Sequence, residues 1–203
     1  MFGSNPNFFI AMIDSKKIKR KVKQKIKSSK AFIHREWFIA FHLNIVEKIV
    51  LELCDVYTEA NKQICLAMVW LHDYQKVIDF DREHKLGIEF KNDLRAMGLN
   101  NEEIATITGY ICMLDSKSQI RKKPIEVQIV SSADGASHMV GPFFSIYWKE
   151  NSGQSVGDIL KENRRKLRLD WKRKIVLPEV RKKFQDRYNV LSEHFGILPS
   201  KYL

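Results

Sequence analysis

Two histidines and two aspartates, His42, His72, Asp73 and Asp134, are the residues whose types and setting could support chemistry. His72 and Asp73 are adjacent and follow an apolar run, so two strongly polar side chains stand at the edge of a core. Burying such groups is costly unless a partner satisfies them. A divalent metal ion would do so, because imidazole and carboxylate ligands suit Mn²⁺, Fe²⁺, Co²⁺, Ni²⁺ or Zn²⁺.

Helices are the elements expected to position these side chains. Apolar residues recur every three or four positions, or fill the segment almost completely, over 31–56, 59–71, 84–97, 101–114 and 125–140. His42 lies in the first stretch, His72 follows the second, and Asp134 lies in the last. No alternation of strand and helix patterns and no hairpin turn signal is present. The sequence therefore predicts an all-α fold in which separate helices bring the four side chains together.

Three parts of the chain are predicted from these patterns. Residues 1–30 form a basic N-terminal leader and helix, 31–142 a metal-binding helical core, and 143–203 a basic C-terminal helical extension that packs on the core. Gly141 and Pro142 mark the second boundary, because both residues end helical patterns.

Basic residues are concentrated near the two ends of the chain. The formal net charge is +11, and nine basic residues fall within 16–30 and seven within 164–174. In the first of these segments the apolar residues form one thin stripe of Ile18, Val22 and Ile26, which is typical of a basic helix docked on the body. A polyanion-binding or membrane-surface role is the alternative for this helix.

Composition indicates a globular protein that folds. Hydrophobic residues make up 44% of the chain and charged residues 29%, unlike the apolar-poor profile of a disordered chain. The longest apolar runs fall far short of the roughly 20 residues that cross a bilayer, so no membrane span is expected. Cys54, Cys65 and Cys112 are isolated and odd in number, as expected for free thiols in a reducing compartment. A cytoplasmic location is the prediction.

The order His42, His72-Asp73, Asp134 resembles the HD-domain superfamily of metal-dependent phosphohydrolases. The segment that begins His42-Leu-Asn-Ile-Val-Glu is similar to the first ligand helix of that family. Trp70-Leu-His-Asp-Tyr-Gln-Lys76 resembles its L-H-D-x-x-K signature, and Glu126-Val-Gln-Ile-Val-Ser-Ser-Ala-Asp134 resembles the segment with the last aspartate. The resemblance covers about half of the chain.

This resemblance implies a bundle of about five core helices, to which the present chain adds N- and C-terminal helices, and hydrolysis of a phosphate ester. The implied cofactor is a divalent ion (Mn, Fe, Co, Ni, Zn or Mg) held by His42, His72, Asp73 and Asp134. Such an ion lowers the pKa of its bound water and withdraws charge from a phosphoryl oxygen. Asp73 and Lys76 are the expected catalytic residues, since Lys76 could reach a non-bridging phosphate oxygen. A solvated surface lysine is the alternative for Lys76.

A second metal site is not expected, because the chain departs from the pattern of two-metal members. His84 could fill the first additional histidine position, but Ile111-Cys-Met-Leu114 stands where an I-x-x-H pattern would end. A single ion points towards phosphomonoester or nucleotide hydrolysis rather than cyclic dinucleotide cleavage. Asp115 could supply a substitute oxygen ligand, or it could simply end its helix.

Two further residues could contact substrate or support the ligands. His138, four residues after Asp134, could face the same cavity or hydrogen-bond a backbone carbonyl. Arg121 lies in the basic loop before the last core helix, where the superfamily often places substrate groups; a solvated charge is the alternative.

Two functions fit these observations. The first is a metal-dependent phosphohydrolase whose partner is a small phosphorylated substrate such as a nucleotide. The second is a non-catalytic HD-fold protein that binds nucleic acid or an acidic partner through its basic ends, although no nucleic-acid motif is present. Monomer and homodimer are both open, because the C-terminal helices could pack on a second subunit as readily as on the body.

Overall fold

The computed structural model describes residues 13–78, 87–115 and 119–201, and these residues are helical or irregular, with no strand among them. The helices are α1 (Ser15–Ser28), η1 (Ile39–Leu43), α2 (Asn44–Val56), α3 (Lys62–Leu71), α4 (Tyr74–Ile78), α5 (Ile88–Ala96), α6 (Asn101–Asp115), η2 (Ile120–Lys122), α7 (Ile125–Ser137), α8 (Phe143–Glu150), α9 (Val156–Leu169), η3 (Asp170–Lys174) and α10 (Pro178–His194). Here η1 and η3 are π-helical turns and η2 is a 3₁₀ turn. The predicted all-α fold is confirmed.

Helix α3 is the central element, as its nearly continuous apolar sequence predicts. It packs against α1, α2, α6 and α7. Its N-terminus is capped by Asn61, whose side chain accepts hydrogen bonds from the backbone N–H groups of Gln63 and Ile64. From Ile64 onwards almost every side chain of α3 is buried, so the helix delivers His72 directly from the core.

The stretch 31–56, predicted as one helix, is divided in the structure. Residues 33–37 form a turn, and the π-helical turn η1 then leads into α2. The rings of Phe32 and Phe38 pack edge to face across this turn, with centroids 5.1 Å apart. A π turn carries an additional residue per turn and is common at functional sites. Here it contains His42, whose side chain is buried.

Helix α1 uses the narrow apolar face that its sequence predicts. Ile18, Val22 and Ile26 are fully buried, and the helix packs on α3 and α4. Outside this face, α1 carries exposed basic side chains at Lys16, Arg20, Lys21, Lys25 and Lys27. Since its apolar stripe is already covered, α1 has no apolar face left to insert into a lipid surface.

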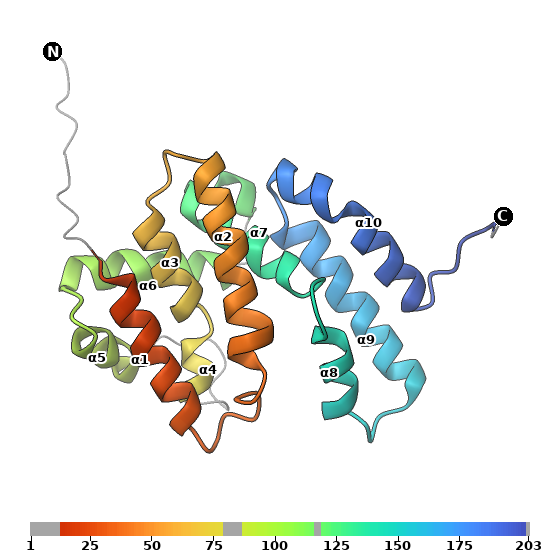
Figure 1. Ribbon diagram of the computed structural model, residues 1–203, viewed down its shortest axis with the longest axis horizontal. Helices are drawn as coiled ribbons and strands as arrows, with labels where there is room; N and C mark the ends of the chain where they lie inside the picture. The colour runs from red at the N-terminus through yellow and green to blue at the C-terminus, as the bar shows by residue number, and fades with distance from the viewer. Residues whose placement is uncertain (1–12, 79–86, 116–118, 202–203) are drawn as a thin grey trace, which may run out of the picture.

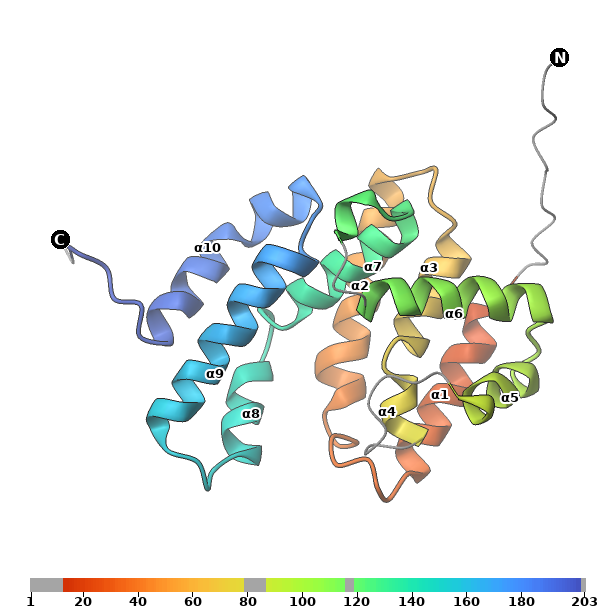
Figure 2. The same cartoon turned by 180° about the vertical axis from the view of Figure 1, so that it is seen from behind.

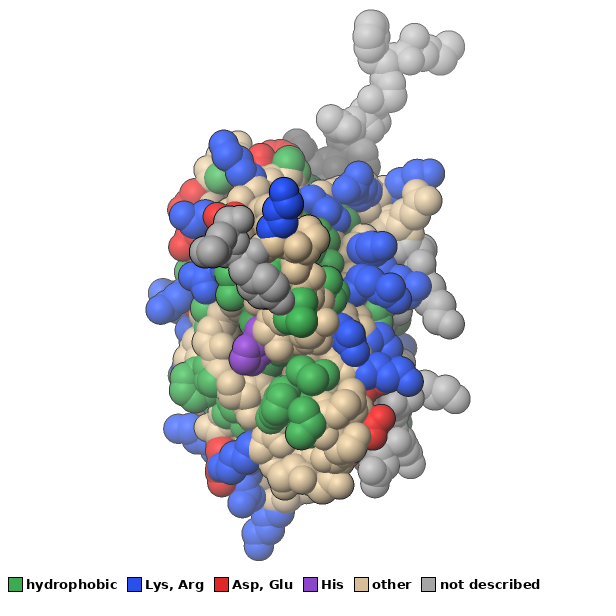
Figure 3. Space-filling model, turned by 90° about the vertical axis from the view of Figure 1, so that its right-hand side faces the viewer, with side chains coloured by type: hydrophobic (Ala, Val, Ile, Leu, Met, Phe, Trp, Pro, Cys, Tyr) green, Lys and Arg blue, Asp and Glu red, His purple; other side chains and the backbone are tan. Residues whose placement is uncertain are grey.

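The C-terminal helices form a layer beside the core (Figures 1 and 2). Helix α9 runs next to α10, and both η3 and α10 contact α7. Seen from this end, basic side chains lie along the margins of the molecule, and hydrophobic side chains lie nearer its middle (Figure 3). Among the described residues, no helix combines the length and apolar character that crossing a membrane requires.

Candidate metal centre

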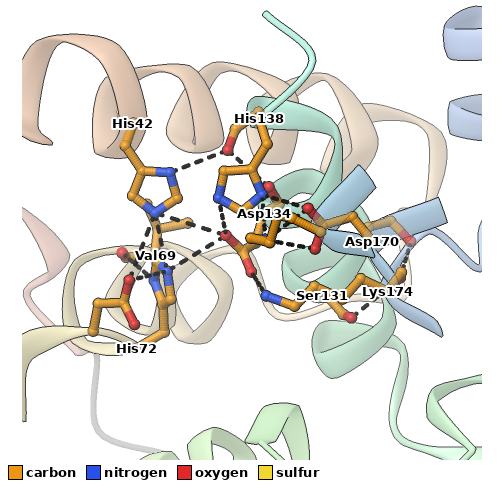
Figure 4. Close-up of polar contacts among 12 residues, drawn as sticks. His42, Val69, His72, Ser131, Asp134, His138, Asp170 and Lys174 are labelled. Atoms are coloured by element: carbon orange, nitrogen blue, oxygen red, sulfur yellow. Dashed lines mark hydrogen bonds and ion pairs between the residues drawn. The ribbon is translucent and has the colours of Figure 1, made fainter. Parts of the chain in front are cut away.

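His42, His72 and Asp134 meet at one point inside the bundle (Figure 4). Each offers one ligand atom, and these atoms all lie within 4.8 Å of one another. His42 comes from η1, His72 from the C-terminal end of α3 and Asp134 from α7. Within the described part of the chain, this buried group is the one that could hold a metal ion.

The hydrogen bonds of the two histidines fix which ring nitrogen carries the proton. The Nδ1–H of His72 donates to the Val69 carbonyl oxygen at 2.9 Å, because a carbonyl can only accept. The Ser137 hydroxyl donates to the Asp134 carbonyl at 2.7 Å and so accepts from His42 Nδ1 at 3.1 Å. Each Nε2 atom therefore carries a lone pair, as a metal ligand must.

These two Nε2 atoms face each other at 3.3 Å. Two lone pairs cannot hydrogen-bond to each other, so the contact requires a cation or an added proton between them. Burial lowers the pKa of His42 well below its ordinary value, which disfavours the added proton. A metal ion bound between the two nitrogens would satisfy both of them.

Carboxylate oxygens complete the arrangement. Asp134 Oδ1 lies 3.7 Å from His42 Nε2 and 3.8 Å from His72 Nε2, and Asp73 Oδ2 lies 3.8 and 3.6 Å from the same two atoms. With metal–ligand distances of about 2.1 Å, neighbouring ligands stand about 3.0 Å apart in an octahedral shell and about 3.4 Å apart in a tetrahedral one. These nitrogen–oxygen separations are slightly wider than both values. The group whose ligand atoms all lie within 4.8 Å of one another is His42, His72 and Asp134. Asp73 lies near both histidines but stands outside this group.

A lysine binds the outer oxygen of each carboxylate. Lys76 Nζ lies 2.6 Å from Asp73 Oδ1, and Lys174 Nζ contacts Asp134 Oδ2. Burial would raise the pKa of each aspartate, but both pKa values lie well below the usual range, and Lys76 at Asp73 and Lys174 at Asp134 are the strongest influences in that direction. Both carboxylates are therefore ionised, and each turns one oxygen towards the histidines.

His138 extends the cluster towards the C-terminal helices. Its ring is buried and stacks parallel to that of His42, and its Nε2 lies 3.6 Å from Asp134 Oδ1. Its Nδ1 lies 2.9 Å from Asp170 Oδ2, and Lys166 Nζ binds both oxygens of Asp170 at 2.7 and 2.6 Å. Burial would raise the pKa of Asp170, but Lys166 and His138 lower it to about 2.

Lys166, Asp170 and Lys174 are site residues that the sequence interpretation missed. They lie within the basic stretch assigned to a C-terminal extension, yet they touch Asp134 and His138. The available signal was their spacing of four residues, which puts one acid and two bases on the same face of a helix.

The other predicted residues lie in different places. Lys76 contacts Asp73 and His138 faces Asp134, both at the cluster. Arg121 is exposed in η2. The pKa of Arg181 in α10 is lowered, first by the burial of Arg181 and second by the charge of Arg121. Asp115 is the last residue of α6, but its side chain is outside what the structure describes, and so is His84.

No family model, curated protein or solved structure matches this chain. Its chemistry must therefore be argued from its own residues.

Proposed function

We propose that the protein is a metal-dependent phosphohydrolase of the HD type that acts on a nucleotide or another small phosphate monoester. The observation that carries the proposal is the pair of Nε2 lone pairs facing each other at 3.3 Å, with a carboxylate oxygen of Asp73 and of Asp134 within 3.8 Å of both. Its setting in an all-helical chain, with the order His42, His72-Asp73, Asp134, supports the HD-type reading.

The ligands would be His42, His72, Asp73 and Asp134. A divalent ion bound by them supplies a Lewis acid for a phosphoryl oxygen and brings the pKa of water towards neutrality. Ser137 and Val69 orient the two imidazoles, and Lys76 and Lys174 hold the outer oxygens of the carboxylates. The chain thus positions each ligand atom before substrate binds, which is the condition for electrostatic stabilisation without reorganisation.

Charge balance favours a monoester over a diester. Three carboxylates, Asp73, Asp134 and Asp170, are paired with three ammonium groups, Lys76, Lys166 and Lys174. The burial of His42 and His138 lowers their pKa values and keeps these imidazoles neutral. With neutral imidazoles and neutral bound water, a divalent ion would leave a site with about two positive charges, which a dianionic phosphate monoester neutralises and a monoanionic diester does not.

The test is phosphate release from a panel of nucleotides and small phosphate esters with Mn²⁺, Co²⁺, Mg²⁺ or no added metal. We expect metal-dependent release that Asp73→Ala abolishes. Asp55→Ala is the matched control, because Asp55 is exposed and its carboxylate pairs with Lys62 at the surface. Full metal-dependent activity in folded Asp73→Ala protein would refute the mechanism.

A second candidate function is polyanion binding by a non-catalytic protein, and the exposed basic face of α1 favours it. Lys16, Arg20, Lys21, Lys25 and Lys27 are exposed, while the buried apolar stripe fixes the helix on the body. Phosphate-backbone binding of this kind weakens steeply as salt rises. Retention of duplex DNA or RNA on filters over a salt series tests it, and no retention at low salt would exclude it.

A further inference from the structure

Lys76 and Lys174 make the same kind of contact, each with the outer oxygen of one aspartate, although they come from distant parts of the chain. Lys76 lies just after the His72-Asp73 pair and binds the outer oxygen of Asp73, whereas Lys174 ends η3 and binds the outer oxygen of Asp134. Both side chains reach solvent, with exposed fractions of 46% and 37%. The two aspartates that they hold each lie within 3.8 Å of the same two Nε2 atoms, so both ammonium groups stand at the border of one cluster.

Lys174 is held in place by the fold and is unlike a solvated surface lysine. The π turn closes with the Ile175 N–H donating to the Asp170 carbonyl at 2.9 Å. The Ser131 hydroxyl donates to the Lys174 carbonyl at 3.1 Å, and Ser132 Oγ accepts from the N–H groups of Val176 and Leu177. Ser131 and Ser132, which lie about one turn before Asp134 in α7, thus hold residues 174–177 in place.

Close packing at Gly135 lets this segment reach Asp134. A Cβ atom at Gly135 would lie 3.0 Å from Lys174 Cβ and 3.0 Å from Ile175 Cγ1. Because Gly135 has no side chain, η3 can pack closely against α7 directly after Asp134. Lys174 then reaches the Asp134 carboxylate.

We propose that Lys174 and Lys76 form a two-lysine clamp for the phosphoryl group of a dianionic phosphate monoester. An ammonium group has three N–H donors, and the contact with its aspartate uses one of them. Each lysine can therefore donate to a non-bridging phosphate oxygen while it still holds the carboxylate. The clamp rests on the proposed phosphohydrolase function and adds to it the residue, Lys174, that selects the charge of the substrate.

Removal of Lys174 has opposite consequences for metal and for phosphate. Its positive charge sits on a ligand carboxylate and repels a metal ion, so Lys174→Met should strengthen the binding of a divalent ion. The same substitution removes a charged donor to phosphate, and hydrogen bonds to charged groups are worth about 1.5–3 kcal/mol, or roughly 10- to 100-fold in affinity. A lysine that only supports the fold would weaken both binding events when removed.

The experiment is isothermal titration of the full-length protein, first with Mn²⁺ and then, once loaded, with inorganic phosphate. Lys174→Met is expected to bind phosphate at least about tenfold more weakly and Mn²⁺ no more weakly than the native protein. Lys174→Arg should keep most of the phosphate affinity. Lys172→Met is the matched control, because Lys172 lies in the same turn with an exposed side chain, and it should leave both affinities unchanged. Dimethyl phosphate, a diester monoanion, should bind the native loaded protein at least about tenfold more weakly than phosphate.

Each contrary outcome has a distinct meaning. Native phosphate affinity in Lys174→Met, a parallel loss of Mn²⁺ and phosphate binding in that variant, or equal binding of dimethyl phosphate would overturn the clamp. Loaded native protein that binds no phosphate would overturn it too, while leaving the metal site in place. Failure of the native protein to bind any divalent ion would instead remove the proposed phosphohydrolase function on which the clamp rests.

Discussion

Gly135 offers the sharpest test of how η3 is joined to the candidate metal centre. It lies within α7, directly after Asp134. In Gly135→Ala the added methyl group would stand 3.0 Å from side-chain carbons of Lys174 and Ile175 and 3.5 Å from the Asp170 carbonyl oxygen. The first two distances are shorter than ordinary van der Waals contact, so η3 must move away from α7 by a few tenths of an ångström.

Two effects of opposite sign set the magnitude. Replacement of a helical glycine by alanine gains about 1 kcal/mol in helix propensity. Overpacking of a tight contact costs about 1–3 kcal/mol. We therefore expect Gly135→Ala to lower the free energy of unfolding by about 1 kcal/mol, and to weaken phosphate binding because Lys174 is displaced from Asp134.

Gly109 supplies the matched control. It lies within α6, and a Cβ atom added there would meet no atom within 4 Å. Gly109→Ala should raise the free energy of unfolding by about 1 kcal/mol, which is the propensity gain alone. Urea denaturation at equilibrium measures both values. If Gly135→Ala stabilised the protein as much as Gly109→Ala does, the close approach of η3 to α7 would be wrong.

Two further predictions concern the same junction. Ser132→Ala removes the acceptor for the N–H groups of Val176 and Leu177 and should cost about 1–3 kcal/mol in urea denaturation, because buried donors are left unpaired; a loss below about 0.5 kcal/mol would contradict this role. Asp170 has a pKa lowered from 3.8 to about 2, so its ionisation contributes about 2 kcal/mol of stability that is present above about pH 4 and lost as the pH falls towards 2. Measurement of the free energy of unfolding as a function of pH should show this decline. Asp170→Asn should be less stable at neutral pH, because Lys166 loses its partner, and should show a smaller decline in acid.

Local pattern was sufficient to predict most of the fold. The predicted stretches 59–71, 101–114 and 125–140 correspond to α3, α6 and α7 within a few residues, because a helix with a long apolar face shows its period directly in the sequence. The turns η1 and η3 could not be predicted in this way. A π turn differs from an α-helix by one inserted residue, and tertiary packing stabilises it rather than any local propensity.

The site could be predicted only in part, for a related reason. His72 was predicted because the His72-Asp73 pair ends an apolar helix, and His42 and Asp134 because they lie on other helices in an order that resembles the HD-domain superfamily. The structure places His42, His72 and Asp134 within reach of one metal ion. Lys166, Asp170 and Lys174 lie in a strongly basic stretch, where charged residues are normally solvated and carry no such contrast. Their burial depends on η3 crossing α7 at Gly135, and this long-range contact is not encoded in the spacing of residues 164–174.

The C-terminal helices are therefore best understood as part of the candidate centre. The core alone would provide Asp73 and Asp134 with one compensating lysine, Lys76, and the resulting negative charge would favour the metal ion but oppose an incoming phosphate. Lys174 reverses that balance at Asp134, because it competes with the ion for the carboxylate while adding a partly exposed positive charge beside it. On the proposed mechanism, one side chain then lowers metal affinity and raises phosphate affinity. Metal and substrate binding are coupled through Asp134 for this reason, even though the lysine itself comes from outside the predicted core.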